Sequence, residues 1–227
     1  MKATGSSTER TIWNYFCCKG FSPAGVAGLM GNLYAESGLN PINLQNTYEK
    51  RLGLTDAEYT AAVDSGSYSN FVRDSAGYGL AQWTYWSRKE AMLNYARKTG
   101  ASIGDLMMQL DFMFQELKGH VAVFQVLRTA RTVKEASDIV LTKYERPADM
   151  SNAVKVKRAS FGQAYYDAYA NTTTTPEKEE ITVSNSPLVT YTNITKNKTS
   201  PRNHAIDTIT IHCIVCLLYT SPSPRDR

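Results

Sequence analysis

The position of Glu36 in the sequence suggests acid chemistry. It follows Leu33 by three residues and Leu29 by seven, so helical spacing places all three side chains on one face. Three effects there favour the neutral carboxyl: burial, the negative partial charge of a helix C-terminus, and the lack of Lys or Arg within a helical turn. A carboxyl that keeps its proton near neutral pH can protonate a departing sugar oxygen. The alternative is a solvated carboxylate bordering the apolar stripe, and periodicity alone leaves both open.

A second candidate element is the segment "GYGLAQWT", residues 77–84. Gly77 and Gly79 let the backbone approach a substrate closely or adopt positive φ, and Gln82 can bond an N-acetyl group. Four aromatic side chains in and after this segment offer flat faces for sugar rings: Tyr78, Trp83, Tyr85 and Trp86. Each of them alone is better explained by core packing, whereas the cluster in a glycine-containing loop favours a cleft.

Both segments resemble motifs of one enzyme superfamily. "AESGLNP", residues 35–41, resembles the Glu-Ser motif of goose-type lysozymes and lytic transglycosylases, and "GYGLAQWT" is similar to their Gly-x-Gly-Leu-x-Gln motif. Together with "YERPAD", residues 144–149, they resemble the phage tail tip lysozyme family over roughly residues 10 to 170. The resemblance implies cleavage of the β-1,4 bond between N-acetylmuramic acid and N-acetylglucosamine in peptidoglycan, with Glu36 as general acid. The substrate-binding candidates are Ser37, Tyr78, Gly79, Gln82, Trp83, Tyr85 and Trp86.

The partner of Glu36 is less clearly marked. Goose-type enzymes carry acids just before and just after the glycine turn, and this chain has Asp74 before it but Thr84 close to the later place. Asp74 is therefore the candidate base, with Asp64 behind it, although either is equally well explained as a solvated loop acid or a turn cap. A well-placed base gives a hydrolase, whereas its lack gives a lytic transglycosylase with 1,6-anhydro products.

The "YERPAD" segment holds two further acids, Glu145 and Asp149. We interpret them as structural neighbours of the cleft, with Arg146 as their ion partner.

The elements that position these residues are predicted to be helices, in an all-α, lysozyme-like domain with a cleft. For the helix that carries Glu36, Ser22 is the expected N-cap, Pro23 the first residue, and Gly38 lies just past the end. Three capping boxes are expected, at Thr55 with Glu58, Ser87 with Glu90, and Thr132 with Glu135. Apolar spacing also predicts helices up to Gly119 and from about 151 to 169.

Composition supports one soluble domain and a tail. The 227 residues are 42% hydrophobic and 20% charged, with a net charge of +4 and no basic run, which gives nucleic-acid binding no support. No segment is long and apolar enough for a secretory signal or a membrane span. We read Cys17 and Cys18 as packing thiols and expect no cofactor and no metal.

The chain is predicted to divide into a muramidase domain at 10–170, a disordered Thr-rich linker at 171–203, a strand at 204–215 and a non-folding tail at 216–227. The strand resembles the truncated start of an N-acetylmuramoyl-L-alanine amidase domain, in which His212 corresponds to a zinc ligand. His212 alone cannot form a zinc site, and Cys213 with Cys216 is a lone pair that we attribute to chance. The tail resembles translated sequencing adapter, and its alternative is a natural disordered terminus.

Bacterial peptidoglycan is the expected partner, followed by phage tail proteins, with no nucleic acid or membrane. The expected location is the virion tail, or the host cytoplasm with release to the cell wall. Two non-enzymatic interpretations stay open: a wall-binding module that keeps the cleft without chemistry, and a structural protein of the phage tail.

Overall fold

The computed structural model describes residues 7–170, and the predicted all-α class is confirmed there. The elements of this range are α1 (Ser7–Cys18), α2 (Pro23–Ser37), α3 (Asn46–Leu52), α4 (Asp56–Asp64), α5 (Trp86–Thr99), α6 (Leu106–Gly119), α7 (Val121–Thr129), α8 (Val133–Ile139), the π-helix η1 (Val140–Glu145) and α9 (Asn152–Tyr169). Extended pairing over 7–170 is limited to two isolated β-bridges, Leu44 with Tyr78 and Tyr78 with Trp83.

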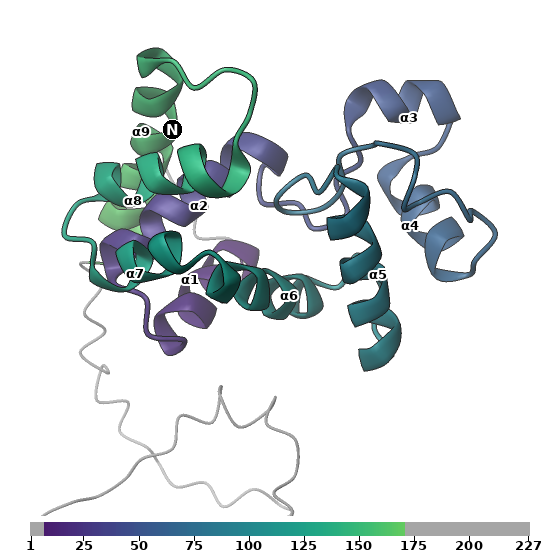
Figure 1. Ribbon diagram of the computed structural model, residues 1–227, viewed down its shortest axis with the longest axis horizontal. Coiled ribbons are helices and arrows are strands. Elements are labelled where there is room, and N and C mark those ends of the chain that lie inside the picture. Colours follow the sequence, from purple (N-terminus) through teal and green to yellow (C-terminus); the bar gives the residue numbers. More distant parts are fainter. Residues whose placement is uncertain (1–6, 171–227) are drawn as a thin grey trace, which may run out of the picture. The chain divides into compact units, whose positions relative to one another are not determined.

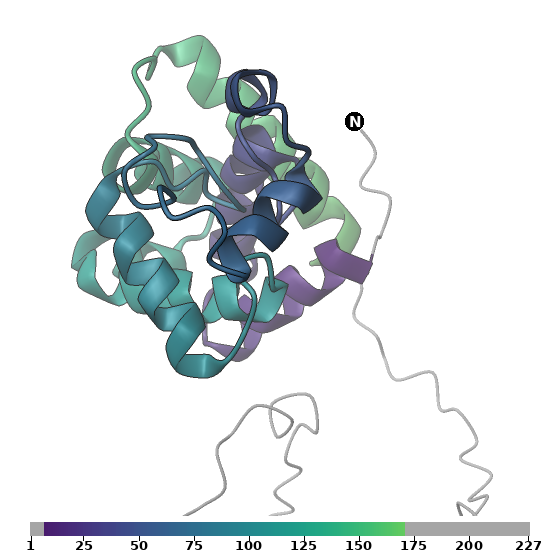
Figure 2. The ribbon, with the colours of Figure 1, turned by 90° about the vertical axis from the view of Figure 1, so that its right-hand side faces the viewer.

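The helices form two groups joined by α6 (Figure 1). The first, which we call the bundle lobe, contains α1, α2, α7, α8, η1 and α9. The second, which we call the small lobe, contains α3, α4, α5 and the loop between α4 and α5. In Figure 2, α1 (purple) lies beside the end of α9 (green), where the rings of Trp13 and Tyr169 are 5.4 Å apart.

Helix α2 is the centre of the bundle lobe. Every residue from Ala24 to Leu33 is buried, so the helix is enclosed on all sides rather than along one stripe. Its predicted start and end are confirmed: the Ser22 hydroxyl accepts a hydrogen bond from Gly25 N at 3.0 Å, Pro23 is the first residue, and Gly38 caps the end with φ 63°. The end of this helix carries Glu36 to the surface of the lobe.

Close helix crossings hold α2 in place. A Cβ built on Gly31 would lie 2.5 Å from the carbonyl oxygen of Arg158 and from the backbone nitrogen of Gly162, both in α9. The same test on Gly28 gives 2.6 Å to Ser137 N in α8, and on Gly25 gives 1.9 Å to Leu127 O in α7. Glycine is required wherever two helix backbones approach this closely. The crossing at Gly31 fixes the position of Arg158 relative to Glu36, one turn further along α2.

The predicted capping boxes have different outcomes. Both halves of the box at Thr55 and Glu58 are present. At Thr132 the hydroxyl accepts from Glu135 N, but the Glu135 carboxylate accepts from Arg131 N instead of closing the box. The box predicted at Ser87 is wrong, because α5 begins at Trp86 and the carbonyl of Tyr85 accepts its first hydrogen bonds.

The remaining helix predictions are confirmed. Helix α6 ends at Gly119, and α9 begins after Ser151, whose hydroxyl accepts from Val154 N. The predicted linker, the amidase-like strand with His212, Cys213 and Cys216, and the tail lie outside the described residues. Among residues 7–170, no helix is both long and apolar enough to span a membrane, and no cluster of three His, Cys, Asp or Glu could hold a metal ion.

Candidate active site

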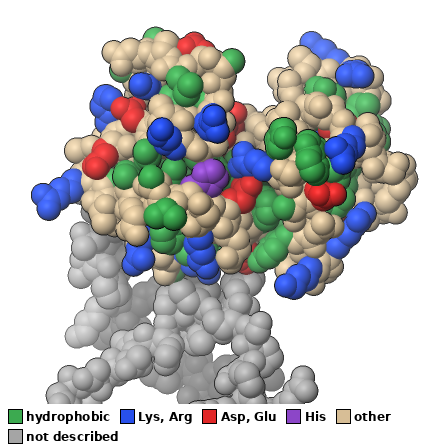
Figure 3. All heavy atoms as spheres, viewed as in Figure 1, with side chains coloured by type: hydrophobic (Ala, Val, Ile, Leu, Met, Phe, Trp, Pro, Cys, Tyr) green, Lys and Arg blue, Asp and Glu red, His purple; other side chains and the backbone are tan. Residues whose placement is uncertain are grey.

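A cleft of about 490 Å³ lies where the two lobes meet, a size typical of ligand-binding sites. Figure 3 shows the molecular surface hollowed between the lobes. The end of α2, the loops around the glycine turn, the start of α5 and the end of η1 all contribute to its walls. The lining residues are Glu36, Gln45, Gly77, Ala81, Gln82, Thr84, Tyr85, Arg88, Glu145, Arg146 and Pro147.

Glu36 is the penultimate residue of α2 and forms an ion pair in this cleft. Its Oε1 lies 2.6 Å from Nη2 of Arg158 in α9, and the two side chains are 20% and 10% exposed. The guanidinium is held from behind by Asn32, whose Oδ1 accepts from Arg158 Nη1 at 3.3 Å. The sequence has no Lys or Arg within one helical turn of Glu36. Arg158 was not predicted as its partner, because it lies far from Glu36 in the sequence and in another helix.

Glu145 lines the same cleft, although it lies far from Glu36 in the sequence. It ends the π-helix, and Arg146 after it has φ 52°, a strained value for a residue with a side chain. The residue is partly exposed, but its Oε1 is buried and accepts no hydrogen bond from residues 7–170. Burial first, and then the nearby charge of Glu36, raise the pKa of Glu145 to about 8, against the opposing effect of Arg88 and Arg158.

Glu145 was predicted to be a structural neighbour of the cleft, with Arg146 as ion partner of Glu145 and Asp149. Glu145 is a neighbour of the cleft, as predicted, yet among residues 7–170 no ion pair joins Arg146 to Glu145 or Asp149. Asp149 is exposed and accepts from the backbone nitrogen of Ser151 at 2.8 Å. That bond lowers the pKa of Asp149.

The carboxylate of Glu116 connects the two walls of the cleft through hydrogen bonds. Glu116 of α6 accepts two hydrogen bonds from Arg88, at 2.8 and 2.9 Å. It also accepts one from Trp83 Nε1 at 2.8 Å and one from the Tyr144 hydroxyl at 2.8 Å. Trp83 and Arg88 belong to the small lobe, and Tyr144 to η1 of the bundle lobe. Arg88 is therefore neutralised by Glu116 and not by either cleft carboxyl.

The glycine turn is held rigidly against the end of α2. The Ser37 hydroxyl donates to Leu80 O at 2.9 Å, and Gly79 has φ 76°, with the amide of Gln109 only 2.8 Å from where a Cβ would stand. Gln82 has φ 46°, and its amide nitrogen donates to Asn43 Oδ1 at 2.8 Å. Gln82 lines the cleft, whereas Ser37 and Gly79 do not and shape the turn from behind.

The aromatic candidates divide into core and surface residues. Tyr78 and Trp83 are 0% exposed, and the Tyr78 hydroxyl bonds that of Thr60 at 2.6 Å. Tyr85 is 63% exposed and lines the cleft, and Trp86 is 39% exposed with the Arg73 guanidinium 4.5 Å from its ring centre. Tyr85 and Trp86 are therefore accessible from solvent, whereas Tyr78 and Trp83 are not, and Trp86 does not line the cleft.

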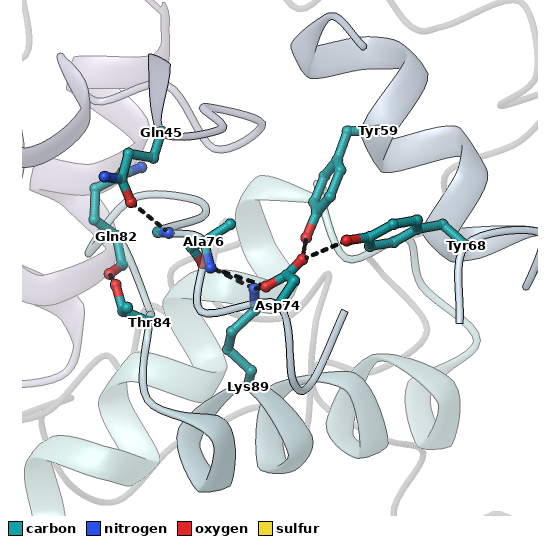
Figure 4. A network of polar contacts seen from close by, with 9 residues as sticks. Gln45, Tyr59, Tyr68, Asp74, Ala76, Gln82, Thr84 and Lys89 are labelled. Carbon is teal, nitrogen blue, oxygen red and sulfur yellow. Dashed lines mark hydrogen bonds and ion pairs between the residues drawn. The ribbon is translucent and has the colours of Figure 1, made fainter. Parts of the chain in front are cut away.

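Asp74, the candidate base, does not line the cleft. Its side chain is 3% exposed, and Lys89 Nζ lies 2.5 Å from its Oδ1. The hydroxyls of Tyr59 and Tyr68 donate to its Oδ2 at 2.5 and 3.1 Å, and Ala76 N donates to Oδ1. Figure 4 shows this carboxylate turned toward the two tyrosines, with Gln82 and Thr84 on the other side of the turn. All of these contacts hold the loop, and the assignment of Asp74 as the base stays a prediction.

Asp64, the second candidate for the base, does not line the cleft either. It accepts from the Ser102 hydroxyl at 2.5 Å and from Ile103 N at 2.9 Å, and so caps the loop before α6. Thr84 lines the cleft, and its hydroxyl donates to Gln82 O at 2.8 Å.

Comparison with known proteins places the chain in a family. The model of a family described as phage tail lysozyme matches residues 7–169. Among curated proteins, morphogenesis protein 1 of Bacillus phage B103 is 24% identical over 158 residues. The match covers 66% of this chain and 36% of that protein, so the chain spans little more than a third of its relative's length.

Proposed function

Since the chain belongs to the phage tail lysozyme family, we propose that its cleft cleaves the β-1,4 bond between N-acetylmuramic acid and N-acetylglucosamine in peptidoglycan. The observation that carries this proposal is the position of Glu36, which lies at the end of a rigidly packed helix and lines the same cleft as a second carboxyl, Glu145. Glycoside cleavage in most enzyme families needs such a pair.

Glu36 is the proposed general acid. As the bond between the sugar C1 and the bridging oxygen breaks, the Glu36 proton passes to that oxygen. Arg158, 2.6 Å away, then stabilises the carboxylate that is left. Water adds to C1 in a hydrolase and returns one proton to the site. In a lytic transglycosylase, the 6-hydroxyl of the same sugar takes the place of water.

Substrate binding is proposed for the open side of the cleft. Tyr85 lines the cleft with an exposed ring on which a sugar can stack, and the exposed ring of Trp86 follows it in the sequence. The carbonyl of the Gln82 side chain, which also lines the cleft, can accept from an N-acetyl group. Ser37, Tyr78, Gly79 and Trp83 act indirectly in this proposal, because they hold the turn that presents Gln82.

The experiment is a digest of purified peptidoglycan with the 227-residue chain, followed by mass analysis of the muropeptides. New reducing ends are expected, and Glu36→Gln should reduce their release at least 100-fold. The matched control is Glu90→Gln, at an exposed position of α5 outside the cleft, which should retain wild-type activity. Equal activity of Glu36→Gln and wild type would remove Glu36 from the mechanism. Products lighter by one water indicate a transglycosylase.

A second candidate function is a structural or wall-binding module of a phage tail. The name of the relative, morphogenesis protein 1, favours it. This function predicts a folded chain that sediments with peptidoglycan, or associates with tail proteins, but releases no muropeptide at any pH. Location in the virion tail is part of both proposals and is tested by mass spectrometry of purified virions.

A further inference from the structure

We propose that Glu145 is a second functional carboxyl of the cleft, and that Glu36 and Glu145 hold one proton between them near neutral pH. This inference deepens the proposed function and rests on it for its kinetic consequence. Its structural part, the shared proton, does not depend on turnover.

The first support is the backbone that presents Glu145. The helix α8 continues into the π-helix η1, a rare conformation that is frequent at functional sites. Arg146 N donates to Leu141 O at 2.9 Å, which closes the last wide turn, and Arg146 then takes φ 52° before Pro147. A regular α-helix would carry residue 145 to a different face, so the wide turn aims Glu145 into the cleft.

The second support is an asymmetry between the two carboxyls. Glu36 forms an ion pair with Arg158 at 2.6 Å. Glu145 has a buried Oε1 without a hydrogen bond from residues 7–170, and a charged oxygen left in this state is costly. A single proton at the site therefore resides mainly on Glu145 in the free protein.

The third support is the charge around Glu145, which comes from every element packed near it. The groups are Glu36 of α2, Arg88 of α5, Glu116 of α6, Arg158 of α9, and its own neighbours Tyr144 and Arg146. Both buried arginines are already engaged, Arg88 with Glu116 and Arg158 with Glu36. Glu145 is thus left without an ion pair beside another carboxylate, and this arrangement agrees with its pKa of about 8.

A shared proton would serve both proposed reaction outcomes. The bridging oxygen takes the proton of the pair through Glu36, and the attacking water or 6-hydroxyl gives one proton back to the pair. The pair starts and ends each turnover with one proton, so no external acid or base is consumed. Because the two groups interact, their titration belongs to the pair rather than to either residue.

The direct experiment is carboxyl carbon NMR of the full chain labelled at Glu, recorded as a function of pH. In the wild type, one Glu resonance should titrate with a midpoint near pH 8, matching the pKa of about 8 for Glu145. That resonance should be lost in Glu145→Gln. In Glu36→Gln its midpoint should fall by at least one pH unit, because the neighbouring charge is gone. Titration of every glutamate below about pH 6 would overturn the proposal.

The kinetic experiment is the pH profile of muropeptide release. Glu145→Gln should move the alkaline limit of activity to lower pH by one unit or more, because the pair then lacks the carboxyl with a pKa of about 8. Glu145→Asp keeps the charge and should keep a limit close to that of the wild type. Superimposable profiles for wild type and Glu145→Gln would also overturn the proposal. An inactive wild type with the NMR transition present contradicts the proposed function and leaves the proton pair standing.

Discussion

Gly31 of α2 and Gly162 of α9 face each other where the two helices cross, and neither position has room for a side chain. A Cβ on Gly31 would lie 2.5 Å from Gly162 N, and a Cβ on Gly162 would lie 2.7 Å from Ala27 O. Glu36 lies on α2 and Arg158 on α9, the two helices that cross here. The packing at this crossing therefore determines the position of Arg158 relative to Glu36.

Substitution of Gly31 by Ala tests this dependence. The added methyl group would force α2 and α9 apart, and we expect a loss of roughly 1–3 kcal/mol in the free energy of unfolding. Activity of the folded fraction should fall as well, because Arg158 moves with α9. Gly119→Ala is the matched control: no atom lies within 4 Å of its Cβ position, and urea unfolding should show no loss of stability. An unchanged unfolding midpoint for Gly31→Ala would contradict the close crossing.

Asp74→Asn distinguishes a loop-holding acid from a base. The substitution leaves Lys89, which is 0% exposed, without its counter-charge, and removing one partner of a buried ion pair costs about 3–5 kcal/mol. We expect a large loss of stability in thermal unfolding, with muropeptide release per folded molecule within a few-fold of wild type. Asp167→Asn, at an exposed position of α9, is the control. A stable but inactive Asp74→Asn would support Asp74 as the base.

The two classes of aromatic side chain should respond differently to truncation. Trp83→Ala removes a fully buried ring and the hydrogen bond to Glu116, with an expected cost of about 3–5 kcal/mol of stability. Tyr85→Ala removes an exposed ring, so stability should not change, whereas stacking worth about 0.5–1.5 kcal/mol would be lost from glycan binding. Co-sedimentation with peptidoglycan and thermal unfolding of both variants make the comparison. Undiminished binding by Tyr85→Ala would exclude Tyr85 as a sugar platform.

Stability should depend on pH through Glu145. The folded pKa of about 8 lies above the value of about 4.3 for an unfolded glutamate, so the folded chain binds the additional proton between these values. The resulting stabilisation is fully present below about pH 4.3 and is lost as pH rises through 8, by an amount on the order of 1–4 kcal/mol. The measured quantity is the unfolding free energy of wild type minus that of Glu145→Gln at pH 5 and pH 9. A difference that does not change with pH would contradict the raised pKa.

Local signals predicted much of this fold. The start, end and composition of α2 follow from Ser22, Pro23, Gly38 and its apolar run, which act on neighbouring residues and can be read from the sequence directly. The false capping box at Ser87 shows the limit of such patterns. Its spacing of Ser and Glu also fits the first turn of a helix that has already begun at Trp86.

The charges around Glu36 could not be predicted in the same way. Arg158 is brought to Glu36 from 122 positions away by the glycine crossing, and Lys89 is brought to Asp74 by the fold of the loop. The π-helix that presents Glu145 to the cleft was not predicted from the sequence, although the "YERPAD" segment did mark this part of the chain as a neighbour of the cleft. Spacing along the chain located the acids, and only tertiary packing assigned their partners.

Glu116 has a consequence for how the cleft exchanges its contents. It receives donors from both lobes, and hydrogen bonds to a charged group are worth about 1.5–3 kcal/mol each. Swinging the lobes apart as rigid bodies would break several of these bonds at once. We therefore expect glycan strands to enter and leave by sliding through an aperture of nearly constant width, without hinge opening at each turnover.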